Sequence, residues 1–215
     1  MPHVNPLGGR AALKELRALH VRDRARIRKR LREFRSVPPA EYFYEIAYCL
    51  LTPQSSARNA GKAVEALRDG CFFERSFDPE PLLRRKESYI RFHRTKAKRL
   101  LRAREEYPVI ARRLSTGSEG GELRKWLVEN VSGLGWKESS HFLRNIGHSG
   151  LAILDRHVLK NLRGLGVLGK LPGALTAKRY LAIEQKFREF SSSVGIPMDE
   201  LDLLFWSMET GEILK

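Results

Sequence analysis

Residues 131–147 read VSGLGWKESSHFLRNIG and contain the turn that decides the fold. Apolar residues recur at helical spacing on both sides of this turn, at Leu123, Trp126, Leu127 and Val131 before it and at Phe142, Leu143 and Ile146 after it. The pattern predicts two helices joined by a tight connection. Gly133 and Gly135 let the backbone bend, and they leave N–H groups uncovered at the start of the second helix, where an anion is favoured.

The charge of the chain indicates what that anion is. Its 215 residues include 40 Lys and Arg against 25 Asp and Glu, a formal net charge of +15. This excess is larger than solubility needs and predicts a polyanionic partner, with nucleic acid as the first candidate. The basic run from Arg22 to Arg35 is also compatible with an ordinary solvated helix face.

Several other classes of protein are excluded. No apolar run approaches the roughly 18 residues needed to cross a membrane, and the N-terminus lacks the apolar core of a secretory signal, so an intracellular, cytoplasmic protein is expected. Cys49 and Cys71 are too few to hold an iron–sulfur cluster or a structural zinc alone. We therefore expect neither a metal nor a cofactor.

The rest of the chain predicts an all-α fold. Helical periodicity recurs over residues 13–34, 41–51, 57–67, 96–114 and 177–190, and alternating β-branched runs are scarce. Proline and glycine clusters separate these stretches at residues 37–39, 78–81, 116–121 and 171–173.

Two motifs carry a family resemblance. Lys137 directly follows the glycines of the turn, and Asp155 follows it by 18 residues (155 − 137) within the AILDRH stretch at residues 152–157. Together these blocks resemble the helix-hairpin-helix DNA glycosylases, and within them the archaeal-type class of 8-oxoguanine DNA glycosylase/AP lyase. A weaker resemblance extends through residues 51–57, 91–98 and 201–215, so it spans most of the chain.

The resemblance implies an organisation and a partner. Residues 50–150 are expected to form a helical barrel with the helix-hairpin-helix at about 123–147. Residues 1–49 and 151–215 are expected to combine into a second helical lobe, with double-stranded DNA containing 8-oxoguanine bound in the cleft between the lobes. We expect a monomer.

The chemistry explains why a lysine stands at the turn. Breaking a glycosidic bond requires a nucleophile at C1′, and an amine that stays attached yields a Schiff base, which permits strand cleavage by β-elimination. Lys137 is predicted to supply this amine, the alternative being a surface lysine that contacts a phosphate. Asp155 precedes a predicted helix, so an N-cap and a carboxylate that stabilises the charged sugar are both compatible with its position.

The remaining site residues follow from the resemblance. Phe92 and Trp206 are expected to stack on the extruded base, although the apolar surroundings of Trp206 also favour core packing. Gln54, at the apparent start of a helix, is expected to fill the gap left by the base or to be an ordinary polar residue at a helix start. Lys215 is expected to read the lesion with its terminal carboxylate and ammonium, or else to be a frayed end.

The DNA backbone is expected to contact five residues, Gly133, Gly135, Arg94, Lys96 and Lys98.

Taken together, the two motifs and the charge predict a bifunctional enzyme that excises 8-oxoguanine and then nicks the strand. Two alternatives remain: the same lyase chemistry on another oxidised base, and a helix-hairpin-helix module that binds DNA without turnover.

Overall fold

The computed structural model describes residues 6–213, and over that range it contains helices and no strand. This confirms the predicted all-α fold. The chain divides into two compact units: unit 1 combines Met1–Ser36 with Gly147–Lys215, and unit 2 is Val37–Ile146. Each unit is described by itself.

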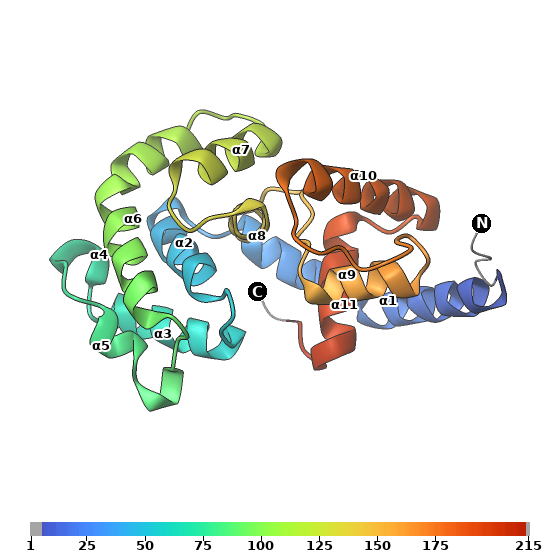
Figure 1. Ribbon diagram of the computed structural model, residues 1–215, viewed down its shortest axis with the longest axis horizontal. Coiled ribbons are helices and arrows are strands. Elements are labelled where there is room, and N and C mark those ends of the chain that lie inside the picture. Colours follow the sequence, from blue (N-terminus) through green and yellow to red (C-terminus); the bar gives the residue numbers. More distant parts are fainter. Residues whose placement is uncertain (1–5, 214–215) are drawn as a thin grey trace. The chain divides into compact units, whose positions relative to one another are not determined.

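Unit 2 is built around α2 (Tyr42–Leu51), whose residues from Phe43 onward are all buried. It packs against α3 (Ala57–Asp69), α6 (His93–Leu114) and α8 (Trp136–Asn145) (Figure 1). The hairpin helix α7 (Gly120–Asn130) packs on both α6 and α8. The short elements complete this unit: η1 (Pro39–Glu41), α4 (Phe72–Arg75), α5 (Glu80–Leu83) and η2 (Lys86–Ser88).

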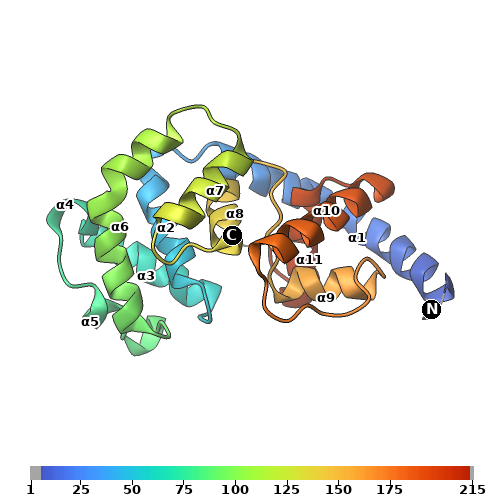
Figure 2. The same cartoon turned by 45° about the horizontal axis from the view of Figure 1, so that its top comes forward.

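Unit 1 contains the first helix and the last three. The 30-residue α1 (Pro6–Arg35) packs along α11 (Met198–Thr210), which also contacts α9 (Arg156–Gly164) and α10 (Ala177–Val194) (Figure 2). A buried polar pair joins the two ends of the chain, because His20 Nε2 lies 2.6 Å from Glu200 Oε2. Arg28 donates to the other oxygen of Glu200 at 2.8 Å.

The boundaries of the units differ from the expected 49/50 and 150/151 and lie at 36/37 and 146/147. The physical reason for the earlier first boundary is α2, which was assigned to the terminal lobe but is the buried centre of unit 2. None of the helices formed by residues 6–213 is long and apolar enough to cross a membrane.

Candidate active site

The predicted hairpin is present, and its two glycines have different roles. Gly133 has a φ of 97°, so the backbone demands glycine, and a Cβ there would also lie 2.6 Å from Arg99 Cδ and force that side chain to move. Gly135 is extended, with φ −87° and ψ −173°, and forms the N-cap of α8. Only Gly133 therefore supplies the sharp bend.

Helix α8 is held on α2 by buried polar and aromatic contacts. Asn145 donates to Glu45 Oε2 at 3.0 Å. One helical turn earlier, the His141 ring packs edge-on against Tyr48, with centroids 5.7 Å apart. These contacts fix the helix whose first turn carries the predicted nucleophile.

Lys137 occupies the first turn of α8, and 30% of its side chain is exposed. Its Nζ lies 3.0 Å from Glu138 Oε1. Sequence reasoning did not single out Glu138, although an acidic residue in the first turn of a helix is favoured there. The amine is thus near the surface and held by a neighbouring carboxylate.

Gln54 and Phe92 both have left-handed backbones, with φ values of 56° and 59°. Gln54 is exposed in the turn between α2 and α3, so the expected position at a helix start is wrong: α3 begins at Ala57, after its N-cap Ser56. Phe92 is the N-cap of α6 and 50% exposed, with the Arg91 guanidinium 4.9 Å from its ring centroid.

The three basic residues predicted on α6 divide between two faces. Arg94 and Lys98 are exposed at i and i+4, and Arg94 Nε lies 3.5 Å from Glu80 Oε1. Lys96 instead is 2% exposed and donates to three protein oxygens. Its ammonium is therefore not available to a DNA phosphate, and the expected backbone contact is corrected for this residue.

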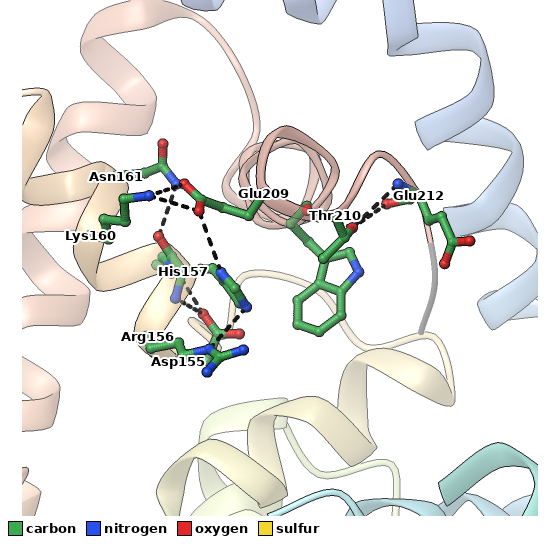
Figure 3. Close-up of polar contacts among 10 residues, drawn as sticks. Asp155, Arg156, His157, Lys160, Asn161, Glu209, Thr210 and Glu212 are labelled. Carbon is green, nitrogen blue, oxygen red and sulfur yellow. Dashed lines mark hydrogen bonds and ion pairs between the residues drawn. The ribbon is translucent and has the colours of Figure 1, made fainter. Parts of the chain in front are cut away.

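In unit 1, Asp155 is the N-cap of α9. Its Oδ1 accepts from the backbone N–H of His157 at 2.9 Å and of Val158 at 2.8 Å (Figure 3). The predicted capping role is thus present in the structure. Among residues 6–213, the second carboxylate oxygen of Asp155 has no hydrogen-bond partner, so it is available to a substrate.

The buried segment before Asp155 is tied to α10. The Tyr180 hydroxyl donates to Ala152 O at 2.6 Å and accepts from Leu154 N at 3.2 Å, while Glu184 accepts from Ala152 N at 2.9 Å. Tyr180 and Glu184 were not predicted, because contacts over 26 to 32 positions leave no local pattern.

Trp206 is half-buried, whereas Leu203, Leu204 and Phe205 beside it form the core. Its ring meets His157 edge-on, with centroids 5.0 Å apart and planes at 82°. The indole Nε1 is buried and has no hydrogen-bond partner in the described part of the chain. Trp206 is therefore not simply a core residue.

A polar cluster joins α9 to α11 beside this tryptophan. Lys160 Nζ donates to both oxygens of Glu209 at 2.8 and 2.9 Å, and Asn161 donates to His157 O at 2.9 Å (Figure 3). The hydrogen bond from Lys160 holds the pKa of Glu209 below its ordinary value. Glu209 lies 4.0 Å from His157 Nδ1, which supports a structural role for that histidine.

The predicted residues therefore form two groups, one in each unit. Unit 2 carries the hairpin glycines, Lys137, Gln54 and the basic face of α6, and unit 1 carries Asp155 and Trp206. Lys215 lies outside the described residues.

Comparison with known proteins identifies the family. Residues 27–196 match the family model described as 8-oxoguanine DNA glycosylase. The chain belongs to the 8-oxoguanine DNA glycosylase family.

Relatives within this glycosylase family are similar over almost their whole length. The 8-oxoguanine DNA glycosylase/AP lyase of Korarchaeum cryptofilum is 41% identical over 88% of this chain and 90% of its own. The protein of that name from Fusobacterium nucleatum is 37% identical over 94% and 96%.

Solved structures of 8-oxoguanine glycosylases have a similar fold. The Methanocaldococcus jannaschii 8-oxoguanine glycosylase/lyase, in complex with a 15-mer DNA containing 8-oxoguanine, has a TM-score of 0.84 at 32% identity and covers 94% of this chain and 99% of its own. The 8-oxoguanine DNA glycosylase of Thermotoga maritima has a TM-score of 0.84 at 29% identity, with 94% and 98% covered.

Proposed function

We propose that this chain excises 8-oxoguanine from double-stranded DNA and then cleaves the strand at the abasic site through a Schiff base on Lys137. The observation that carries the proposal is the amine of Lys137, partly exposed at the first turn of the second hairpin helix in a member of this family. We expect it to act as a monomer, located with the nucleoid in the cytoplasm.

The reaction begins at C1′ of the damaged nucleotide. The neutral Lys137 amine forms a bond to C1′ as the glycosidic bond breaks, and the base leaves with the bonding electrons and takes up a proton. Opening of the sugar ring gives an imine. Loss of a proton from C2′ then expels the 3′ phosphate, and hydrolysis of the imine frees the lysine.

Two carboxylates support this chemistry. Glu138, 3.0 Å from the Lys137 amine, holds it before attack, and that ion pair is given up when the amine loses its proton. The available oxygen of Asp155 stabilises the positive charge that develops on the sugar. Its other oxygen stays fixed by two backbone N–H groups, so the carboxylate is oriented in advance.

Recognition of the lesion requires that the base leave the helix, which costs a few kcal/mol. Phe92 and Trp206 are proposed to stack on its two faces, and Gln54 to occupy the gap left in the duplex. Lys215 is proposed to read the altered N7 edge. Gly133, Gly135, Arg94 and Lys98 are proposed to contact the DNA backbone.

The decisive experiment is reduction with borohydride in the presence of duplexes that each carry one lesion. We expect covalent trapping on the 8-oxoguanine duplex with the native chain, and no trapping with Lys137→Gln, since the amide cannot form an imine. Lys62→Gln, which changes an exposed lysine of α3 in the same unit, is the matched control and should trap normally.

The other outcomes identify the alternatives. Trapping on an oxidised pyrimidine instead would change the substrate but keep the mechanism. Binding without any trapping would indicate a hairpin module without turnover. Normal trapping by Lys137→Gln would show that another amine is the nucleophile.

A further inference from the structure

Lys96 is the most deeply buried lysine whose contacts the structure records, and its ammonium is fully used. Its side chain comes from the first turn of α6, and Nζ donates to Leu51 O at 2.7 Å, Pro53 O at 2.6 Å and Ser55 Oγ at 3.1 Å. An ammonium has three donors, so each of them is matched by one oxygen. All three acceptors belong to the end of α2 and the turn that follows it.

Ser55 extends this contact to a second segment. Its Oγ also accepts from the backbone N–H of Arg91 at 3.0 Å. Asn59, in the first turn of α3, holds the second segment from the neighbouring helix, with Nδ2 donating to Tyr89 O at 3.1 Å. The turn at residues 52–56 and the turn at residues 89–92 are therefore joined through one hydroxyl that is itself held by Lys96.

Each of the joined turns carries one strained residue. Gln54 and Phe92 are two of the four non-glycine residues with positive φ in the described chain. A left-handed backbone costs such a residue about 1–3 kcal/mol, and it persists only where the surroundings enforce it. The Gln54 side chain makes no hydrogen bond to residues 6–213, the Phe92 side chain has no hydrogen-bonding group, and both side chains are exposed.

We propose that Lys96 is a positioning residue: its buried ammonium holds the Gln54 turn and the Phe92 turn as one rigid unit, so that both side chains meet the damaged strand already in place. The inference rests on the proposed function, in which Gln54 fills the gap and Phe92 stacks on the base. Lys96 itself touches neither.

The three hydrogen bonds of Lys96 depend on pH, because together they require its charged ammonium form. Burial, aided by the positive charges of Arg99 and Lys137 and opposed by Glu138, lowers the pKa of Lys96 to about 8. A neutral amine has only two N–H groups and cannot serve three oxygens. Above this pH one of the three bonds is lost, and the joined turns loosen.

The test compares two activities of the full chain under single turnover: excision of 8-oxoguanine and cleavage of a preformed abasic site. Both activities use the Lys137 amine, so any change in that amine alters both rates, and the ratio of the excision rate to the cleavage rate is independent of it. Lys96→Met should lower excision about 100-fold, the loss that a displacement of about 1 Å can cause, and leave abasic-site cleavage within about threefold. A 2-aminopurine beside the lesion should report slower base extrusion.

Ser55→Ala also tests whether the two turns are held together, and it only removes a hydroxyl, whereas Lys96→Met introduces a different side chain into a buried site. It cuts the link to Arg91 and should lower excision about 10-fold, less than Lys96→Met does, because the bonds from Lys96 to the two carbonyls remain. In the native chain the ratio should fall as pH rises from 7 to 9. In Ser55→Ala the decline should be much smaller, because the two N–H groups of neutral Lys96 still serve both carbonyls.

Three results separate the possibilities. Equal losses of both activities in either variant, or a pH decline unchanged in Ser55→Ala, would overturn the inference and leave Lys96 a purely structural residue. If Lys96→Met does not fold by circular dichroism, Ser55→Ala alone decides. Failure of the native chain to excise 8-oxoguanine would refute the proposed function instead. Lys62→Gln should preserve both activities and the pH dependence.

Discussion

Asp155 has a structural task, the N-cap of α9, and a proposed chemical one, the stabilisation of positive charge on the sugar. A carboxylate at a helix N-terminus satisfies two orphan N–H groups, and the helix dipole favours its negative charge. One oxygen accepts both hydrogen bonds of the cap, and the other is the one that we propose meets the substrate. The cap thus fixes the position of the carboxylate to which we assign this role.

Asp155→Asn should therefore separate stability from catalysis. Asparagine caps helices about as well as aspartate, so the melting temperature should stay close to that of the native chain. Single-turnover excision should fall roughly 100-fold or more, as when one preorganised electrostatic group is lost.

Thr176→Ala is the matched control, because it removes the N-cap of α10 in the same unit. It should cost about 1 kcal/mol of stability and leave the excision rate of the folded protein unchanged. Excision by Asp155→Asn at the native rate would reduce Asp155 to a cap.

Elements with strong local patterns could be predicted from sequence, and contacts between elements could not. The periodicity of residues 13–34 and 96–114 correctly indicated α1 and α6. The four-residue α4 and α5 are too short to show a period. The hairpin and the first-turn position of Lys137 followed from the glycines, and the cap at Asp155 from its place before a helix.

The errors at the site have the same origin. The proline before Gln54 favoured a helix start, but the chain forms a left-handed turn there, and this turn is bonded to a lysine 43 positions after the proline. The same lysine was expected at the DNA backbone because it lies in a basic run. Helical periodicity alone places residue 96 opposite residues 94 and 98, yet only the structure shows which oxygens it meets.

Helix α10 provides a prediction at the scale of elements, because the hydroxyl of its Tyr180 is hydrogen-bonded to Ala152 and Leu154 in the segment just before Asp155. Tyr180→Phe leaves Leu154 N–H and Ala152 C=O without this partner in a buried site. Denaturant unfolding should show a loss of about 1–3 kcal/mol. Excision should fall as well, even where the variant is fully folded.

Tyr42→Phe is the control for the loss of a hydroxyl, since that hydroxyl makes no hydrogen bond to residues 6–213. Its stability and excision should match the native chain. A Tyr180→Phe variant with native stability would show that the two bonds contribute nothing measurable.

At the scale of the whole molecule, the net charge of +15 predicts binding that weakens steeply with salt. Each phosphate contact contributes about −0.9 to the slope of log K against log salt. Arg94→Gln with Lys98→Gln should therefore make the slope shallower by about 2 for lesion and undamaged duplexes alike. Fluorescence anisotropy over a salt series measures it.

Lys178→Gln with Lys186→Gln lowers the net charge by the same amount through two exposed lysines of α10. This pair should change the slope much less, because the effect depends on which cations meet phosphates. Equal slopes for the two double variants would mean that overall charge, and not the face of α6, governs binding.

The division of the chain has a consequence during synthesis on the ribosome. Unit 2 is one continuous stretch, so it can fold once Ile146 has left the exit tunnel. Helix α1 packs on α11 and must wait for it, because α11 begins 163 residues after Arg35 (198 − 35). At about 5–20 residues per second that delay is roughly 10–30 s. The nascent chain thus completes the unit that carries the amine before the unit that carries the carboxylate, and until α11 has emerged α1 lacks the helix on which it packs.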